Sequence, residues 1–398
     1  MLKGYFMELQ VDKNILKPNS FIDEYNKELL KRIYNNNFDL YYAKDIIIYL
    51  LILYKDTGSN FYKTLILKIN DEYMKNYKHY TFNNSFWYGH SSYLYILNKM
   101  HEYGIIKDGN FNSYKNILLE NIRDIVNGNY IQNHRWYDLF NGLNGNLTFL
   151  LQYDDIQIKK EVCIVVDYIV SELNKLSLNQ DNIFVIYEEN YIDKKMKEIF
   201  NENYIDLGVA HGLINVLQIL YKIYRKYNYS QAKNGMNILI DFYYNLMLRF
   251  DGKIDSLERI SSDKNITYAG DKNIYRWGNG VQTTIIYLTY YCKLIGNKKY
   301  NFFEKMIDIE NLKKDISNLN ETKAFINGVS GYIFNYCLIL DTVNKNDEEN
   351  KLKIYKILNQ LLENFEFTDN FSLMEGNLSP VICMAFFSNE IIFEMLGF

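Results

Sequence analysis

A short phrase built around glycine recurs along the chain and constrains the fold more than any other sequence feature. Three clear copies lie at Phe140–Gly145, Val209–Asn215 and Ile326–Gly331, and three weaker copies begin at Tyr88, Arg276 and Glu375. Each copy precedes an apolar run long enough for a helix, and successive copies are separated by about 50 to 70 residues, the length of a helical hairpin with its loops. The repeat predicts an all-α fold, an α/α toroid (barrel) of repeated helical hairpins whose inner helices start at the glycine-rich turns.

The stretches on either side of the phrases have helical character. Proline occurs only at Pro18 and Pro380, so long segments contain no helix breaker. Apolar residues at helical spacing predict outer helices at residues 114–126, 162–176, 236–250, 302–319 and 352–365. The runs after the phrases predict inner helices at residues 93–100, 147–152, 213–224, 282–294, 332–340 and 381–387. We expect one domain over residues 1–398, with a small insertion around residues 177–205.

Composition excludes several classes of protein. Lys and Arg number 44 against 48 Asp and Glu, with no basic block, which argues against nucleic-acid binding. The longest apolar run, Ile46–Tyr54, is far shorter than the roughly 20 residues of a membrane span, so no transmembrane segment is expected. The four cysteines are scattered without a Cys-x-x-Cys pair, which fits a reducing, cytoplasmic location.

The residues next to the glycines are candidates for a functional site. If the inner helices line a barrel, their N-termini bring free N–H groups and positive dipole ends to one mouth. The residue before the first glycine of each copy would project toward the same axis: Tyr88, Asn141, His211, Asn327 and Glu375, with Arg276 added if Trp277 takes the glycine's place in its copy. The plainer alternative is that the glycines serve close helix packing and their polar neighbours cap helices.

His211 and Asp138 are the candidates for proton transfer. His211 stands between two small residues, Ala210 and Gly212, where an imidazole could act as a general acid or base or could simply cap a helix. Asp138 precedes Gly142 by four residues and could pair with a histidine across the pocket, cap a helix or pair with Arg135.

These phrases resemble the lanthionine synthetase C family, the lantibiotic cyclases, from about Ser85 to Ser379. Leu207–Gly212 is similar to the family's Gly-Leu-Ala-His-Gly motif, which carries a catalytic His, and Tyr137–Gly145 to the motif with a catalytic Asp. The resemblance implies an α/α toroid that adds a cysteine thiol of a ribosomal precursor peptide to a dehydroamino acid, closing a thioether ring. It also implies a zinc ion that lowers the pKa of that thiol, and a dehydratase or transporter of the same pathway as partner.

The zinc ligands that the resemblance implies are missing from this sequence. The family uses the Cys of a Trp-Cys-x-Gly motif and both residues of a Cys-His pair before glycine. Here Ile326 and Asn327 stand in the second motif. In the first, aligning the tryptophans puts Gly278 at the cysteine position, and aligning the last glycine puts Tyr275 there. None is a usual zinc ligand, so we expect no cofactor.

Three functions remain open at this point. The protein could catalyse thiol addition without zinc, with Arg276 and helix N-termini stabilising the developing negative charge. It could be a catalytically inactive scaffold that binds the precursor peptide for partner enzymes. It could also have been recruited to other chemistry, such as carbohydrate cleavage by Asp138 and Glu375. The candidate pocket-lining residues are Tyr88, Asn141, Trp277, Asn327 and Glu375.

Overall fold

The computed structural model describes the chain in segments that form two compact units. The units are Met1–Tyr80 with Ile309–Phe393 (unit 1) and Thr81–Asp308 with Glu394–Phe398 (unit 2). The described residues are 20–77, 87, 89–107, 111–128, 137–140, 142–190, 203–249, 259–262, 267–268, 276–278, 280–317, 324–326, 328–342, 356, 362, 365 and 367–380. The single domain expected from the sequence therefore stays a prediction.

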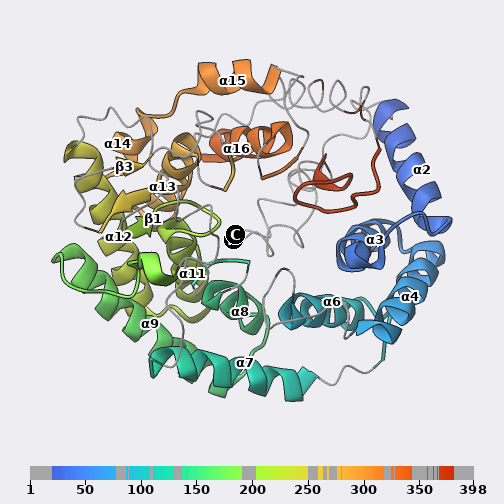
Figure 1. Cartoon of the computed structure of the whole chain (residues 1–398), viewed down its shortest axis with the longest axis horizontal. Coiled ribbons are helices and arrows are strands. Elements are labelled where there is room, and N and C mark those ends of the chain that lie inside the picture. Colours follow the sequence, from blue (N-terminus) through green and yellow to red (C-terminus); the bar gives the residue numbers. More distant parts are fainter. Residues whose placement is uncertain are drawn as a thin grey trace. The chain divides into compact units, whose positions relative to one another are not determined.

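Unit 2 is built from two layers of helices (Figure 1). Neighbours in the first layer contact one another in chain order: α6 (His90–Glu102), α8 (Leu143–Leu150), α11 (Leu213–Tyr227) and α13 (Val281–Ile295). The second layer packs on them and consists of α7 (Phe111–Val126), α9 (Ile156–Ser177), α12 (Ser230–Arg249) and the short α14 (Tyr300–Glu304). The first-layer helices are those predicted to follow the glycine phrases, and the second-layer helices are those predicted to alternate with them.

A glycine caps the N-terminus of every first-layer helix of unit 2. Three of these caps share nearly one backbone conformation, with φ/ψ of −108°/−156° at Gly89, −110°/−161° at Gly142 and −106°/−166° at Gly212. Gly280 caps α13 in a different extended conformation, with φ −69° and ψ 141°. The repeated phrase is thus a repeated helix start, as the sequence predicted.

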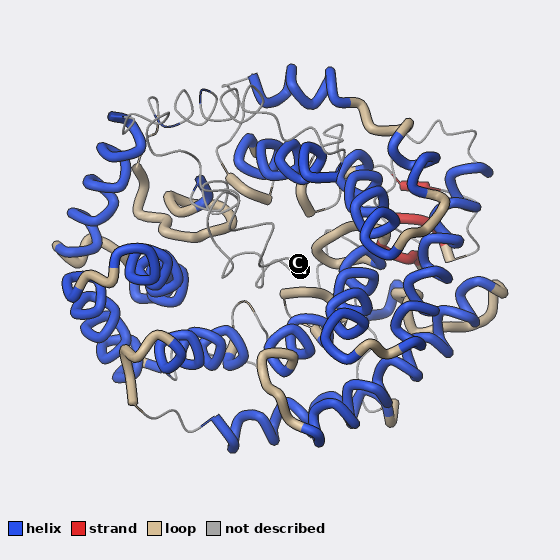
Figure 2. The backbone as a smooth tube through the Cα atoms, turned by 180° about the vertical axis from the view of Figure 1, so that it is seen from behind, coloured by secondary structure: helices blue, strands red, loops and turns tan. Residues whose placement is uncertain are grey.

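A small antiparallel sheet accompanies the helices of unit 2 (Figure 2). Its strands are β1 (Tyr204–Asp206), β2 (Arg259–Ser261) and β3 (Thr267–Tyr268), with Ile205 opposite Ile260 and Arg259 opposite Tyr268. The 3-10 turn η2 (Glu188–Asn190) precedes it. Sequence patterns did not predict this sheet, because strands of two or three residues are too short to show an alternation.

Unit 1 contains α2 (Ser20–Tyr34), the 3-10 turn η1 (Leu40–Tyr42), α3 (Ala43–Thr57), α4 (Asn60–Lys75), α15 (Ile309–Ser317) and α16 (Val329–Thr342). Helix α3 packs on α4, and nine consecutive or near-consecutive side chains between Ala43 and Ile52 are buried, which explains its nearly continuous apolar sequence. Helix α4 was not predicted from the sequence. Ser59 caps it by accepting a hydrogen bond from the N–H of Phe61 at 3.3 Å.

The helix expected at residues 302–319 is interrupted. Helix α14 ends at Glu304 and α15 begins at Ile309. Between them, the side-chain amide of Gln282 donates to the carbonyl of Met306 at 3.3 Å and accepts from the N–H of Asp308 at 3.0 Å. A side chain from α13 thus satisfies backbone groups that a continuous helix would pair internally.

The remaining predicted helices are only partly covered. Residues 381–387 and all but Lys356, Leu362 and Phe365 of the 352–365 segment lie outside the described residues. In the part of the chain that the structure describes, no helix combines the length and the apolar character that crossing a bilayer requires.

Candidate functional site

The loop that carries His211 leaves the small sheet directly and is held at several points. Asp206, the last residue of β1, accepts a hydrogen bond from the N–H of Gly208 at 2.8 Å. The carbonyl of Leu207 accepts one from the hydroxyl of Tyr243 at 2.7 Å. Gly212 then begins α11 so close to this loop that a Cβ there would lie only 2.2 Å from the backbone nitrogen of Gly208, which leaves no room for a side chain. The sheet and the helix start therefore fix the backbone on both sides of His211.

The structure brings Asp138 and His211 together, although they are 73 positions apart in the sequence. The Oδ2 atom of Asp138 lies 2.8 Å from Nδ1 of His211. The Asp138 side chain is fully buried, whereas 43% of the His211 side chain is exposed. A carboxylate bonded to Nδ1 holds the imidazole in the tautomer whose Nε2 is the proton acceptor. The pair thus has the geometry of an oriented general base.

An aromatic cluster packs against the histidine. The ring centroid of Phe140 lies 5.8 Å from that of His211 and 6.0 Å from that of Trp277. Trp87 meets the same Phe140 ring edge-on at 5.3 Å. Trp277 is fully buried and donates from its indole Nε1 to the hydroxyl of Tyr287 at 2.7 Å. These contacts restrict the imidazole on one side and make its orientation depend on packing as well as on Asp138.

Backbone hydrogen bonds connect each described glycine phrase of unit 2 to the next one along the chain. The acceptor is each time the carbonyl of the residue two positions before the capping glycine. The bonds run from Trp87 N–H to Phe140 at 2.9 Å, from Leu139 to Ala210 at 3.2 Å, and from Val209 and Ala210 to Gly278 at 2.8 and 3.0 Å. In unit 1, Phe325 and Ile326 donate to Met374 in the same way, at 2.8 and 3.2 Å. The repeated phrase is therefore also a repeated hydrogen-bonding unit.

This pattern corrects the register assumed for the copy that begins at Arg276. Because Gly280 caps α13 and Gly278 is the acceptor, Trp277 does not take the place of a capping glycine. Asn279 holds the position that corresponds to His211, and it lies outside the described residues. Arg276 is half-buried, and its carbonyl accepts from Gly280 at 2.8 Å. Its role in stabilising negative charge stays a prediction.

The structure describes only some of the other predicted pocket residues. Tyr88, Asn141 and Asn327 lie outside the described residues. Glu375 is exposed and belongs to unit 1, whereas Asp138 and His211 belong to unit 2. The structure therefore describes Asp138, His211 and Trp277 of the expected group. A common pocket that also includes the other predicted residues stays a prediction.

Two buried asparagines that the sequence analysis missed support the His211 loop. The side-chain amide of Asn215 donates to the carbonyls of Gly212 at 2.8 Å and of Ala210 at 3.4 Å, which flank His211. Asn144 of α8 in turn donates to Oδ1 of Asn215. Both asparagines are 1% exposed. The available signal was an asparagine two or three positions after the capping glycine of each of these helices, next to the motifs that carry Asp138 and His211.

We expect Asn215→Ala to lower the free energy of unfolding by about 1–3 kcal/mol, because it removes the side-chain bonds to the Gly212 and Ala210 carbonyls and takes the acceptor of the buried Asn144 amide away. Denaturant unfolding followed by circular dichroism measures this. Asn234→Ala is the matched control, since Asn234 is exposed on α12 and its side-chain amide bonds the nearby Gln231 side chain on the same helix. A change within about 0.5 kcal/mol is expected for the control. Equal effects of the two substitutions would contradict the supporting role.

The residues at the family's zinc positions do not fit a zinc ion. With Gly280 as the cap of α13, the Trp-Cys-x-Gly motif aligns with Trp277–Gly280, so Gly278 stands at the cysteine position and offers no side chain. Ile326 has an apolar side chain. The described residues contain no cluster of three or more His, Cys, Asp or Glu side chains suited to a metal. Cys292 lies in the last turn of α13, at the opposite end from Gly280, and burial raises the pKa of its thiol to about 12.

Comparison with known proteins identifies the family. The model of the family "Lanthionine synthetase C-like protein" matches residues 34–301, about two thirds of the chain. The chain belongs to this family. Among solved structures it is similar to nisin cyclase, with a TM-score of 0.71, 17% sequence identity, and coverage of 94% of this chain and 97% of that one. The fold is therefore the all-α α/α toroid predicted from the glycine phrases.

The sequence is also similar to a protein that is described as a toxin. Botulinum neurotoxin type D from Clostridium botulinum D phage is 23% identical over 368 residues. The match takes in 74% of this chain but only 29% of the toxin's length. Because the identity is low and most of the toxin has no counterpart here, this similarity supports no functional conclusion.

Proposed function

We propose that the protein matures a ribosomally made peptide by adding a cysteine thiol of the peptide to a dehydroalanine or dehydrobutyrine, with the Asp138–His211 pair as its proton-transfer group. The observation that carries the proposal is the 2.8 Å contact between the buried carboxylate and the half-exposed imidazole, on the two motifs that resemble the family's catalytic Asp and His. The partner is a precursor peptide that already carries the dehydroamino acid.

The reaction needs one proton removed and one delivered. Nε2 of His211 takes the thiol proton, and the sulfur forms a bond to the β-carbon of the dehydroamino acid while the carbon–carbon π bond breaks. The resulting enolate takes a proton at its α-carbon, so the addition is balanced without an oxidant or reductant. Asp138 keeps the imidazole oriented and stabilises the imidazolium between the two transfers. Arg276 is the candidate cation for the enolate charge.

An oriented histidine can supply the thiol activation that the missing zinc ligands do not. An unperturbed cysteine thiol and an unperturbed imidazole differ by about 2 pKa units, which makes proton transfer between them unfavourable by about 3 kcal/mol. A buried carboxylate beside the imidazolium offsets part of this cost. The remaining penalty is small against the barrier of an ordinary enzymatic reaction, so the proposed steps need no metal.

We place the protein in the cytoplasm, because its cysteines are scattered and form no Cys-x-x-Cys pair. The family suggests a dehydratase or a transporter of the same pathway as a second partner. The geometry does not favour the carbohydrate alternative, because the Asp138 carboxylate is fully buried and bonded to His211. A peptide-binding scaffold without activity is the second candidate, and the absent zinc ligands favour it.

Incubation of the purified protein with a dehydrated, cysteine-containing precursor peptide tests the proposal. Free thiol is titrated over time, and mass spectrometry excludes disulfide formation, since thioether closure leaves the mass unchanged. We expect thiol loss well above the rate without protein. Peptide binding without thiol loss would establish the scaffold instead.

A further inference from the structure

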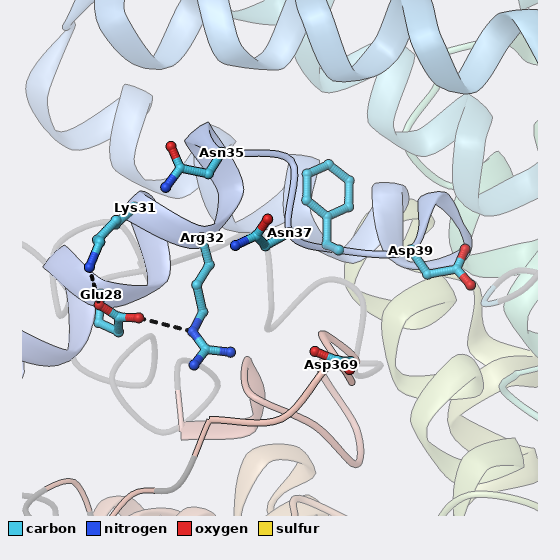
Figure 3. A pocket seen from close by; sticks show the side chains of 8 residues that line it. Glu28, Lys31, Arg32, Asn35, Asn37, Asp39 and Asp369 are labelled. Atoms are coloured by element: carbon cyan, nitrogen blue, oxygen red, sulfur yellow. Dashed lines mark hydrogen bonds and ion pairs between the residues drawn. The ribbon is translucent and has the colours of Figure 1, made fainter.

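A cavity in unit 1 has walls that carry charges of both signs. Its volume is about 550 Å³, and it lies between the end of α2, the turn after it, and the segment around Asp369 (Figure 3). Lys31 and Arg32 bring positive charge, whereas Glu28, Asp39 and Asp369 bring negative charge. The remaining lining residues are Asn35, Asn37 and Phe38. None of these residues belongs to the site described above.

Arg32 is held so that its orientation is defined. Its Nε donates to Oε1 of Glu28 at 3.0 Å, and its guanidinium carbon lies 5.1 Å from the centre of the Phe367 ring. One edge and one face of the guanidinium are thereby occupied. In Figure 3 the two terminal nitrogens extend away from Glu28. A guanidinium fixed in this way loses little entropy when its remaining nitrogens bind a carboxylate.

Asp369 is presented by a turn of defined shape. Asn377, which belongs to the glycine phrase that begins at Glu375, accepts a hydrogen bond from the N–H of Thr368 at 3.0 Å and donates one to the Thr368 carbonyl at 2.7 Å. The N–H of Asn377 also bonds the carbonyl of Asn370 at 2.8 Å. Asp369 is thus the exposed tip of a turn that one asparagine holds on both sides. Its carboxylate forms no ion pair with another described residue.

The turn between Arg32 and Asp39 is equally well defined. Asn37 donates its N–H to the carbonyl of Arg32 at 2.9 Å, and Asn36 adopts a left-handed conformation with φ 57°, as at the end of many helices. Asp39 caps η1 by accepting from the N–H of Tyr41 at 2.8 Å. The amides of Asn35 and Asn37 therefore line the cavity from a fixed backbone and can bond the amide groups of an extended chain.

We propose that this cavity binds a short extended segment of a peptide that carries one acidic and one basic side chain. Arg32 takes the acidic group, Asp369 and Asp39 take the basic group, and Asn35 and Asn37 bond the peptide backbone between them. Three carboxylates against two cations disfavour polyphosphates and other polyanions. The inference rests on the proposed function only in taking a peptide as the partner, and it adds a binding site built from residues other than Asp138 and His211.

Capped tetrapeptides test this site without any dehydroamino acid or thiol. The probes are Glu-Ala-Lys-Ala and the reversed order Lys-Ala-Glu-Ala, with neutral Gln-Ala-Gln-Ala as the control, and titration calorimetry measures their affinity at low salt. We expect one charged probe to bind at least about tenfold more tightly than the neutral one, and salt at about 0.5 M to remove most of that difference.

Asp369→Asn should lower the affinity for the charged probe by up to about fivefold, because one partly exposed ion pair is lost. Asp71→Asn is the matched control, because Asp71 is exposed on α4 of the same unit and does not line the cavity. Equal binding of charged and neutral probes, no binding of either charged probe, or equal effects of the two substitutions would overturn the assignment. Because the probes cannot form a thioether, these results are independent of whether ring closure occurs.

Discussion

Replacing His211 with alanine is expected to slow thiol addition by between about 10²-fold and 10⁴-fold, because the substitution removes the group that takes the thiol proton and returns a proton to the α-carbon. The measurement is the rate of thiol loss from the dehydrated peptide at saturating peptide. Because His211 also bonds the buried Asp138 carboxylate, the substitution is expected to lower the unfolding midpoint, so the rates are compared at a temperature at which both proteins are folded. A loss of rate under those conditions reflects chemistry and not folding.

His101→Ala is the control for this experiment. His101 is exposed in the last turn of α6 and lies outside the Asp138–His211 pair. Asp138→Asn completes the set: an asparagine amide can present a donor to Nδ1 and so favour the tautomer in which Nε2 is protonated, and we expect a loss comparable to that of His211→Ala. A His211→Ala rate within about threefold of the parent's would exclude His211 as the proton-transfer group.

Gly212→Ala is expected to cause the largest loss of stability. A Cβ at this position would lie 2.2 Å from the backbone nitrogen of Gly208, 2.3 Å from Oδ1 of Asp206 and 2.6 Å from the carbonyl carbon of Leu207. Two of these atoms are backbone and cannot move without breaking the start of α11. We expect the free energy of unfolding to fall by at least about 3 kcal/mol, which corresponds to a fall of at least about 4 °C in the melting temperature of a chain of 398 residues.

Gly235→Ala separates this effect from crowding in general. Its Cβ would lie 2.9 Å from Cδ1 of Leu220 and from Cγ2 of Val170. Those methyl groups can shift, and alanine favours the helix α12 by about 1 kcal/mol over glycine. We therefore expect a much smaller change. Similar melting temperatures for Gly212→Ala and the parent protein would show that the loop before α11 is not as tightly held as described.

The glycine phrases predicted the part of the structure that depends on repetition. They located the starts of α6, α8, α11, α13 and α16 because a glycine cap followed by an apolar run is a local signal. They also pointed to His211 and Asp138, whose motifs resemble those of a family. That these two side chains touch is a long-range fact, which the resemblance implied but no local pattern could show.

Features that depend on contacts between distant segments were missed. The Asn144–Asn215 bond joins two helices, and neither residue has a distinctive spacing by itself. The interruption between α14 and α15 depends on the side chain of Gln282, which comes from another helix. The register around Trp277 could not be read from the sequence because two glycines, Gly278 and Gly280, compete for the same position in the phrase.

The most direct test of the account compares ring closure by the protein before and after exhaustive treatment with a strong zinc chelator. We predict that the metal-free protein consumes peptide thiol at the parent rate and that added zinc does not raise it, because Gly278 and Ile326 stand where zinc ligands would be needed. Loss of activity on chelation, restored by one equivalent of zinc, would contradict the claim that Asp138 and His211 carry the proton transfer without a metal.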